Sequence, residues 1–527
     1  MSRKVRFILV ALLLLAFFGY RQYRDHARDA SADDTPAGST SANGAAVTKA
    51  KPAPPARPRM LGSLAFTPCT LPSQLGAPGV EAQCGSLPVA ENPALPQGRK
   101  VVLNIAWIPA DEDGEKAPDP VFLLAGGPGQ SATASYPAVA PAFKDVLKQR
   151  GVVLVDQRGT GKSNPLQCED IAEGEPSLDE AAMQQAMLVA VERCRDALSK
   201  RADLRFYTTT DAVRDLDAVR QAIGAETINL LGISYGTRVA QQYARAYPRH
   251  TRTLVLDSVA PNDLYLGNDF ARNLESALDL QFARCGKIPA CAKALGNPRE
   301  QLDALMARLK ADPPLVTYRD ASTGQSKQER LLPAHIAGLA RMYAYSPMVS
   351  SILPLLIHEG AQGRYDGLMA LSKMLGSQLS DQMAYGMQLS VICSEDADGL
   401  KDDPDMAASL LGNSLVAGLS SQCAAWPKGE RPDDFHAPLA SDVPALLLSG
   451  ELDPVTPPAY AARVVKTLPR GRALMLRGQG HNVIGAGCMP KLFAQFLDTA
   501  DAKGLDAECL EKLAYTPPFT SFNGWGP

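Results

Sequence analysis

The sequence has no marked excess of positive or negative charge, and no two of its cysteines form a short metal-binding pair. There are 53 basic and 56 acidic side chains, which leaves a net charge of −3 over 527 residues. Proteins that bind nucleic acid usually carry a basic excess, so this balance gives no reason to expect such a partner. None of the ten cysteines stands in a C-x-x-C pair, so zinc-ribbon and thioredoxin-type sites have no support.

A phosphate-binding P-loop is also absent, although one glycine-rich segment resembles part of it. Residues 159–163 read GTGKS. The full pattern requires a first glycine at the position where this chain has Asp156. Pro165, two residues after the segment, opposes a helix that would begin there. Nucleotide binding is therefore not expected.

The overall composition is that of an ordinary globular protein. Apolar residues make up 46% of the chain and charged residues 21%, which supplies ample material for a core. No internal repeat is evident. The length predicts one large catalytic unit that carries an insertion.

The first 20 residues have the pattern of an export signal. Arg3, Lys4 and Arg6 precede an apolar run over 7–18. No good cleavage site follows at once, which favours an uncleaved signal-anchor; a cleaved signal peptide stays open, because the run is shorter than the roughly 20 residues of a comfortable span. Residues 21–60 predict a disordered linker. We expect a protein anchored on the periplasmic side of a bacterial inner membrane, or secreted if the signal is cleaved.

The ten cysteines form an even set beside this export signal. Five disulfides in an oxidising compartment are the simplest interpretation. Sequence does not determine connectivity, but cysteines that are neighbours in the chain are the expected partners. The expected pairs are Cys69 with Cys84, Cys168 with Cys194, Cys285 with Cys291, Cys393 with Cys423, and Cys488 with Cys509.

Strand-like and helical segments alternate along most of the chain, which indicates an α/β fold. Several apolar runs are nearly continuous Val, Leu and Ile, as expected of strands covered on both faces of a parallel sheet. The expected strands include 101–108, 121–125, 152–155, 228–231, 254–256, 445–449 and 473–476. The alternation breaks over 262–442, which predicts a mainly helical cap between the sixth and seventh core strands. The core then comprises 61–261 and 443–527, with the cap over the carboxyl ends of its strands.

Residues 232–236 read GISYG between an apolar run and a helix-like run, which is typical of a strand, a sharp turn and a helix that present a serine nucleophile. The flanking glycines are required because a Cβ would clash with nearby backbone in so tight a turn. Ser234 is the candidate nucleophile. The N–H of Tyr235 is left free to face an oxyanion.

A serine hydroxyl requires a base that a third group orients. Asp453 and His481 follow the last two predicted strands, 28 residues apart, as two adjacent strand-end loops require. Glu451 is a rival acid nearer the strand, and Asp453 alternatively caps the following helix. The other five histidines lie in the linker, before a core strand or in the cap: His26, His250, His335, His358 and His436.

A glycine-rich turn follows the predicted strand 121–125 and reads GGPG over 126–129. Backbone N–H groups of Gly126 and Gly127, together with Tyr235, are candidates for an oxyanion hole. An ordinary strand-end turn is the alternative.

Taken together, these motifs resemble the α/β-hydrolase superfamily, and more narrowly its exported proline iminopeptidase and tripeptidyl aminopeptidase group of serine peptidases. The matching pieces are residues 126–129, 156–163, 232–237, 453–457 and 480–481, with Cys488 and Cys509 near the end. The resemblance implies a fold with a mostly parallel sheet, helices on both faces and a cap. It also implies acyl-enzyme chemistry through Ser234, Asp453 and His481.

Two further points follow from this resemblance. The family often has histidine before the glycine-rich turn, where this chain has Ala125. The family's aminopeptidases bind the substrate's free amine through carboxylates of the cap, and segment 391–396 resembles the part that supplies one, which nominates Glu395. An ammonium drawn from water needs such a carboxylate. The alternative is a solvated acidic helix end.

The sequence therefore predicts an exported serine hydrolase, an aminopeptidase that acts on short peptides. Two alternatives stay open: a carboxylesterase on small esters with the same three residues, and a catalytically silent binding protein of the same fold. No metal or organic cofactor is implied. The expected partner is a peptide or small ester substrate, membrane contact is expected only through the N-terminal segment, and the oligomeric state is not predicted.

Overall fold

The computed structural model describes residues 58–73, 78–111, 116–168, 179–321, 323–380 and 383–524. The predicted signal-anchor lies outside the described residues, as does the predicted linker except for its last three residues, of which Arg59 and Met60 belong to the first strand. Over the described ranges, no helix combines the length and the apolar character that a membrane span requires.

A ten-stranded sheet runs through the described chain in the order β1-β2-β3-β4-β6-β5-β7-β8-β11-β12. Neighbours from β1 to β6 are antiparallel, and neighbours from β6 to β12 are parallel. The strand bounds are β1 Arg59–Leu61, β2 Leu64–Leu71, β3 Val80–Ala90, β4 Lys100–Ile108, β5 Val121–Leu124, β6 Val152–Val155, β7 Ile228–Ile233, β8 Thr251–Asp257, β11 Ala445–Gly450 and β12 Gly471–Leu476.

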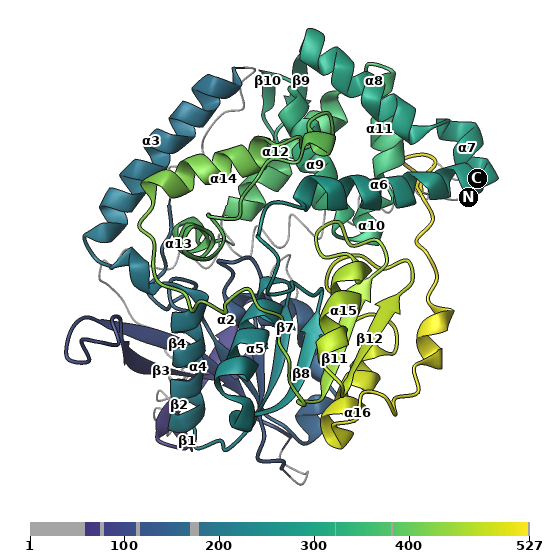
Figure 1. Ribbon diagram of the computed structural model, residues 1–527. Coiled ribbons are helices and arrows are strands. Elements are labelled where there is room, and N and C mark those ends of the chain that lie inside the picture. The colour runs from purple at the N-terminus through teal and green to yellow at the C-terminus, as the bar shows by residue number, and fades with distance from the viewer. Residues whose placement is uncertain are drawn as a thin grey trace, which may run out of the picture. The chain divides into compact units, whose positions relative to one another are not determined.

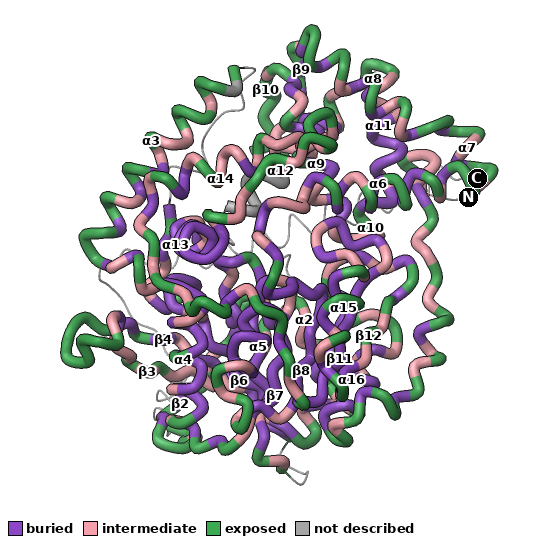
Figure 2. The backbone as a smooth tube through the Cα atoms, in the orientation of Figure 1, coloured by how far each residue is buried: buried purple, intermediate pink, exposed green. Residues whose placement is uncertain are grey.

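Helices cover both faces of the sheet (Figure 1). One apolar cluster joins the sheet to α4 (Thr209–Ala222) and α5 (Tyr235–Ala246). A second cluster joins the opposite face to α2 (Ala132–Val139) and α16 (Met489–Thr499). Successive strand residues alternate between the two clusters, as Leu230 and Leu231 do. The central strands are buried throughout (Figure 2), which explains their continuous apolar sequence.

A mainly helical insertion separates β8 from β11, which are the sixth and seventh strands of the ten-stranded sheet when they are counted along the chain from β3. Buried residues from 274 to 369 form an apolar cluster of their own, whereas residues 384–393 and Cys423 belong to the first cluster of the core. The insertion also contains a hairpin that the sequence did not predict. The bounds are α6 Phe270–Lys287, α7 Pro289–Leu295, α8 Pro298–Ala311, β9 Leu315–Arg319, β10 Ser326–Arg330, α9 Pro333–Ala344, α10 Pro347–Ser350, α11 Leu353–Ala361, α12 Asp366–Ser380, α13 Tyr385–Glu395 and α14 Ser414–Ala425.

Two contacts place parts of this insertion on strand-end loops of the core. The N–H of His481 donates to the carbonyl of Tyr345 at 2.8 Å, and the N–H of Ala384 donates to the carbonyl of Gly129 at 3.0 Å. The core itself contributes one long helix to this layer. Helix α3 (Glu180–Ser199), which follows β6, lies beside α14 (Figure 1), where Arg195 donates to the carbonyl of Ala425 at 2.9 Å.

All five expected disulfides are present, and neighbours in the chain pair as predicted. They join Cys69 to Cys84, Cys168 to Cys194, Cys285 to Cys291, Cys393 to Cys423, and Cys488 to Cys509. All five act within the core or within the insertion, over sequence separations of 6 to 30 residues. The bond between Cys393 and Cys423 ties α13 to α14 and so fixes the helix that ends at Glu395.

Candidate active site

Ser234 occupies the sharp turn between β7 and α5, with a positive φ of 56°. Positive φ is unusual for a non-glycine residue and costs on the order of 1–3 kcal/mol. The neighbouring glycines make the turn possible. A Cβ on Gly232 would lie 2.3 Å from the carbonyl oxygen of Gly236, and one on Gly236 would lie 2.2 Å from that of Leu124. The sequence pattern therefore predicted this turn for the right physical reason.

Asp453 and His481 lie together at the carboxyl ends of β11 and β12. Oδ2 of the Asp453 carboxylate is 2.8 Å from Nδ1 of the His481 imidazole. The same carboxylate accepts hydrogen bonds from the N–H of Val455 at 2.9 Å, and from the N–H of Thr456 at 2.8 Å and its hydroxyl at 2.9 Å. Its side chain is fully buried. The carboxylate is thus held by four donors, one of which is the imidazole.

Electrostatics favours the charged forms of this pair. Burial alone would raise the pKa of Asp453, but the adjacent imidazole and the hydrogen bonds to the carboxylate lower that pKa below its ordinary value. Burial alone would lower the pKa of His481, but the charge of Asp453 and the hydrogen bond to it raise that pKa. An imidazole held in this way can take up a proton at its free nitrogen, Nε2.

Glu451, the rival acid, lies elsewhere. Its two carboxylate oxygens accept hydrogen bonds from the N–H of Gly478 at 2.8 Å and from the Tyr515 hydroxyl at 3.0 Å. It therefore ties the loop after β12 to the C-terminal segment. The structure brings Asp453, and not Glu451, to His481.

One residue of the sheet connects the serine turn with the histidine loop. The backbone carbonyl of Asp257, at the end of β8, accepts the N–H of Ser234 at 2.9 Å, and its carboxylate accepts the N–H of Val483 at 2.9 Å. Within the described residues, no hydrogen bond joins the Ser234 hydroxyl directly to the His481 ring. Such bonds are often long in a ligand-free enzyme and tighten when substrate binds.

The glycine-rich turn after β5 lies against the serine. A Cβ on Gly126 would be 3.2 Å from the Cβ of Ser234, and Gly127 has a φ of 107° that favours glycine. Among the described residues, nothing accepts a hydrogen bond from the N–H of Gly127 or of Tyr235. Two backbone donors are thus free beside the hydroxyl, which is the arrangement that an oxyanion requires.

With this geometry in place, comparison with known proteins is informative. The profile of the alpha/beta hydrolase fold matches residues 119–485, more than two thirds of the chain. The chain belongs to the α/β hydrolase fold family.

Three relatives illustrate its similarities. Serine protease Hip1 of Mycobacterium tuberculosis is 26% identical over 501 residues, which cover 86% of this chain and 92% of that protein. A tripeptidyl aminopeptidase of Streptomyces coelicolor is 30% identical over 188 residues, 34% of this chain and 35% of that protein. A solved proline iminopeptidase of Mycobacterium smegmatis matches with 16% identity and a TM-score of 0.36, covering 79% of this chain and 96% of that one.

In this α/β hydrolase, the segment that resembles a P-loop supports the glycine-rich turn. Asp156, at its start, is fully buried and accepts hydrogen bonds from the Ser131 hydroxyl at 2.6 Å and from the N–H of Thr133 at 3.0 Å. A Cβ on Gly161 would lie 2.2 Å from the Asp156 carboxylate, so the glycines of this segment serve close packing around it. The segment holds the first turn of α2, which follows the glycine-rich turn.

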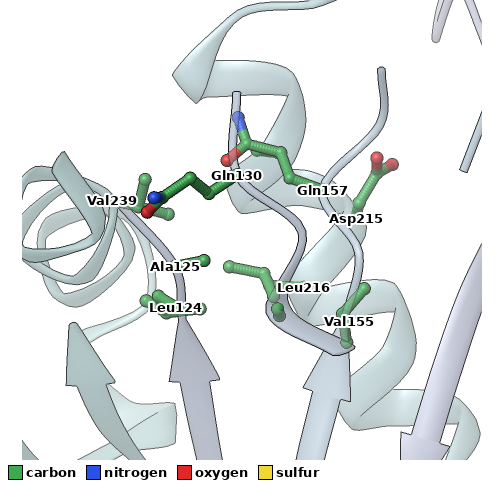
Figure 3. A pocket seen from close by; sticks show the side chains of 10 residues that line it. Leu124, Ala125, Gln130, Val155, Gln157, Asp215, Leu216 and Val239 are labelled. Atoms are coloured by element: carbon green, nitrogen blue, oxygen red, sulfur yellow. The ribbon is translucent and has the colours of Figure 1, made fainter. Parts of the chain in front are cut away.

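A small pocket lies behind the glycine-rich turn (Figure 3). Ala125 and Gln130, which flank the turn, line it together with Gln157 and Asp215. Gln157 also donates to the Tyr235 hydroxyl at 3.2 Å, which links this pocket to the residue after the serine. Ala125 occupies the position at which the family that the chain resembles often has histidine. This wall of the pocket therefore has no imidazole ring at that position.

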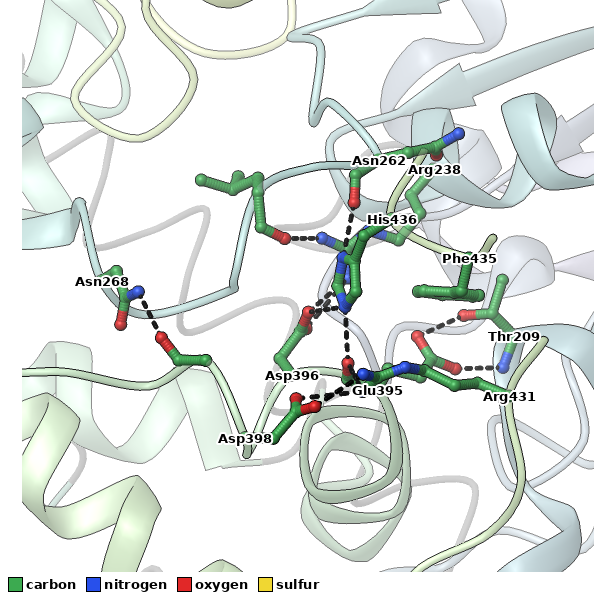
Figure 4. A network of polar contacts seen from close by, with 12 residues as sticks. Thr209, Arg238, Asn262, Asn268, Glu395, Asp396, Asp398, Arg431, Phe435 and His436 are labelled. Carbon is green, nitrogen blue, oxygen red and sulfur yellow. Dashed lines mark hydrogen bonds and ion pairs between the residues drawn. The ribbon is translucent and has the colours of Figure 1, made fainter. Parts of the chain in front are cut away.

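Glu395 is fully buried at the end of α13 (Figure 4), so it is not a solvated helix end. Its two carboxylate oxygens accept the N–H of Thr209 at 2.6 Å and the Thr209 hydroxyl at 2.9 Å. That hydroxyl is 2.6 Å from the hydroxyl of Tyr235. Burial raises the pKa of Glu395 to about 8, since the nearby charge of Arg238 and the Thr209 hydrogen bonds only partly oppose it.

The neighbouring Asp396 has a different partner. Arg238 of α5 donates to its carboxylate at 2.9 Å, and both side chains are fully buried. The ring of His436 lies between the carbonyls of Asn262 and Glu395, at 2.8 Å from each (Figure 4). Glu395 is therefore held in a packed polar layer behind the side chain of Tyr235, the residue that follows Ser234.

Three residues at the site were not predicted. Thr456 and Asp257 each follow a predicted strand, so the reasoning that selected Asp453 could have selected them as well. Tyr345 comes from the insertion, and the centroid of its ring is 5.0 Å from that of the His481 ring. Nothing in the local sequence around Tyr345 indicates that contact, because it depends on how the insertion packs on the core.

Proposed function

We propose that this α/β hydrolase is an exported serine hydrolase, and specifically an aminopeptidase that acts on short peptides through an acyl-enzyme. The observation that carries the proposal is the buried hydrogen bond of 2.8 Å between Asp453 and His481, at the strand ends beside the turn of Ser234. A relative that spans most of the chain is named a serine protease, and another relative is named a tripeptidyl aminopeptidase. Both names favour amide over ester substrates.

In the proposed mechanism, the Ser234 oxygen attacks the substrate's carbonyl carbon while Nε2 of His481 takes the hydroxyl proton. Asp453 keeps the other ring nitrogen protonated and stabilises the imidazolium that forms. The N–H groups of Gly127 and Tyr235, with Gly126 beside them, hold the oxyanion. The imidazolium then gives its proton to the leaving amine. A water molecule, deprotonated by His481, attacks the acyl-enzyme and restores the serine.

We propose that Glu395 recognises the free amine of the substrate. Its burial means that the ionised carboxylate is poorly solvated, and an arriving ammonium would favour ionisation by supplying the missing opposite charge. Binding would require Thr209 to give up at least one of its two hydrogen bonds to Glu395. The connection of Thr209 to Tyr235 would then couple amine binding to the oxyanion site.

The five disulfides support a location outside the cytoplasm, because such bonds persist in oxidising compartments. We propose export to the periplasmic side of a bacterial inner membrane. Labelling of cysteines in intact cells, with and without reductant, tests this location. Free thiols in the cell-extracted protein would contradict it.

Turnover of matched amides and esters tests the reaction. Aminoacyl, dipeptidyl and tripeptidyl p-nitroanilides are compared with p-nitrophenyl acetate and butyrate, with Ser234→Ala as the control for contaminating hydrolases. We expect amide turnover that requires a free amine and disappears in the variant. Ester turnover without amide turnover would replace the peptidase by an esterase. An absence of both, together with no labelling by an alkyl fluorophosphonate, would leave a silent binding protein.

A further inference from the structure

Asp257 is a second buried carboxylate at the site, and nothing in the proposed chemistry uses it. It is the last residue of β8 and is fully buried. Its two oxygens accept the N–H of Val483 at 3.0 and 2.9 Å, and one of them also accepts the N–H of Ile484 at 2.8 Å. Both donors belong to the loop that carries His481.

Ser258, the next residue, adds one more hydrogen bond to the same loop. The hydroxyl oxygen of Ser258 accepts the N–H of Asn482 at 2.8 Å. Asp257 and Ser258 together therefore bind the three consecutive backbone N–H groups of residues 482–484. This segment begins directly after His481, so its position sets the position of the imidazole.

Asp257 and Ser258 are also hydrogen-bonded to Ser234 and to β11, the strand that precedes Asp453. The carbonyl of Asp257 accepts the N–H of Ser234 at 2.9 Å, and the N–H of Ser258 donates to the carbonyl of Leu448 in β11 at 2.9 Å. Ser234, Ser258 and Asn482 have positive φ values of 56°, 60° and 66°. Such a cluster of unfavourable backbone conformations persists only where surrounding bonds enforce it, and is typical of functional sites.

We propose that Asp257 is a positioning residue, which holds the His481 loop against the Ser234 turn and places a second carboxylate near the imidazole. This inference rests on the proposed function of Ser234 and His481. It adds a second carboxylate to the site. Asp453 binds the imidazole ring of His481, and Asp257 binds the backbone of the loop that follows His481.

The charges around the two groups agree with this role. His481 faces Asp453 from the loop after β11, Asp257 from β8, and the uncharged side chains of Thr456 and Tyr345. Asp257 faces His481 and Asp453. Burial raises the pKa of Asp257 to about 6, against the opposing effect of the loop's N–H groups and of His481. The carboxylate is therefore ionised at neutral pH, when it can accept all of these bonds.

The test is the rate of inactivation by an alkyl fluorophosphonate, measured from pH 5 to 9. In this reaction the Ser234 oxygen forms a bond to phosphorus, fluoride leaves, and His481 takes the hydroxyl proton. In Asp257→Asn, the amide cannot accept all of the bonds and carries no charge. We expect a rate roughly 10- to 100-fold lower, because small displacements of a catalytic group are costly. We also expect the acid limb of the profile to move to lower pH by about 0.5 to 1 unit, because the imidazolium loses a nearby negative charge.

Two further variants distinguish positioning from general loss of stability. Ser258→Ala removes the hydroxyl that accepts the N–H of Asn482 at 2.8 Å and donates to Asp257 at 3.3 Å, without removing a charge. The rate should therefore fall several-fold with an unchanged acid limb, and this variant decides the positioning role if Asp257→Asn does not fold. Asp217→Asn removes a buried carboxylate that Arg220 and Tyr243 hold on α4. It should lower the melting temperature and leave the profile unchanged.

The outcomes separate this inference from the proposed function. If the wild-type chain does not react, or if Ser234→Ala reacts equally well, the proposed function fails. If the wild type reacts through Ser234 and folded Asp257→Asn keeps either its rate or its acid limb, the role of Asp257 is overturned. An unchanged rate in Ser258→Ala would likewise overturn the positioning of the loop.

Discussion

The hydroxyl of Thr456 donates to Oδ2 of Asp453 at 2.9 Å, the same oxygen that faces His481, and it lies 3.3 Å from Nδ1 of that ring. Thr456 therefore fixes the carboxylate in the orientation that the imidazole needs. In Thr456→Val the shape is nearly kept while the hydroxyl is lost. We expect kcat/KM to fall about 10- to 100-fold, since a hydrogen bond to a charged group contributes about 1.5–3 kcal/mol.

Thr456→Ser is the matched control for that prediction, because it restores the hydroxyl without the methyl group. Its kcat/KM should lie within a few-fold of the wild type. A valine variant as active as the wild type, or a serine variant that loses as much as the valine variant, would contradict a role specific to the hydroxyl.

The pH dependence of activity should reflect the pair of Asp453 and His481. The base must be neutral to accept a proton, and its pKa is raised by Asp453, so activity should be lost as pH falls through a value above the ordinary 6.5 of histidine. Asp453→Asn removes the charge that raises this pKa. We expect kcat to drop by roughly 10⁴, and the acid limb of the residual activity to move to lower pH. A pH profile identical to that of the wild type would contradict the pairing.

Amine recognition by Glu395 predicts a loss that depends on the substrate. In Glu395→Gln, kcat/KM on a free-amine peptide amide should fall roughly 10- to 100-fold, since a buried partner for the ammonium is removed. Turnover of p-nitrophenyl acetate, which has no amine, should stay within about two-fold of the wild type. Thr209→Val serves as a control that disturbs the same layer without removing the carboxylate. Equal losses on both substrates would contradict the assignment.

The elements that the sequence predicted most clearly are those determined by residues close together in the chain. The runs that became β5, β6 and β11 are apolar because the strands are covered on both faces, so their composition alone identified them. The glycines around Ser234 are required by backbone clashes within the turn itself. By contrast, β2 has several exposed residues and β3 is mostly half-buried, and they contain Pro68, Pro88 and Gly85, which weakened their pattern.

The parts that sequence did not predict depend on contacts between distant segments. The burial of Glu395 follows from the packing of α13 against Thr209, 186 residues earlier in the chain. Tyr345 reaches His481 only because the insertion folds over the core. The role of Asp257 becomes visible only when the end of β8 and the loop after β12 are seen side by side, 226 residues apart.

The turn of Ser234 predicts a sharp contrast between two glycine substitutions. A Cβ on Gly236 would lie 2.2 Å from the Leu124 carbonyl oxygen, so Gly236→Ala must displace β5 or the turn. We expect loss of fluorophosphonate labelling and a lower melting temperature. Gly338 lies within α9 with nothing within 4 Å of its Cβ position, so Gly338→Ala should be stabilising by about 0.5–1 kcal/mol. Similar melting temperatures for the two variants would contradict this account of the turn.

The burial of Glu395 predicts how stability changes with pH. Its pKa rises from 4.5 to about 8 on folding, so across that interval the folded state retains a proton that the unfolded chain releases. Stability should therefore fall as pH rises from about 4.5 to about 8. Glu395→Gln cannot ionise, so its melting temperature relative to the wild type should increase steadily between pH 5 and 8.5. Glu359→Gln is the control, because Arg364 lowers the pKa of the Glu359 carboxylate. The melting temperature of this variant relative to the wild type should therefore not increase as the pH rises. A constant difference between Glu395→Gln and the wild type would show that Glu395 titrates near its ordinary value in the folded protein.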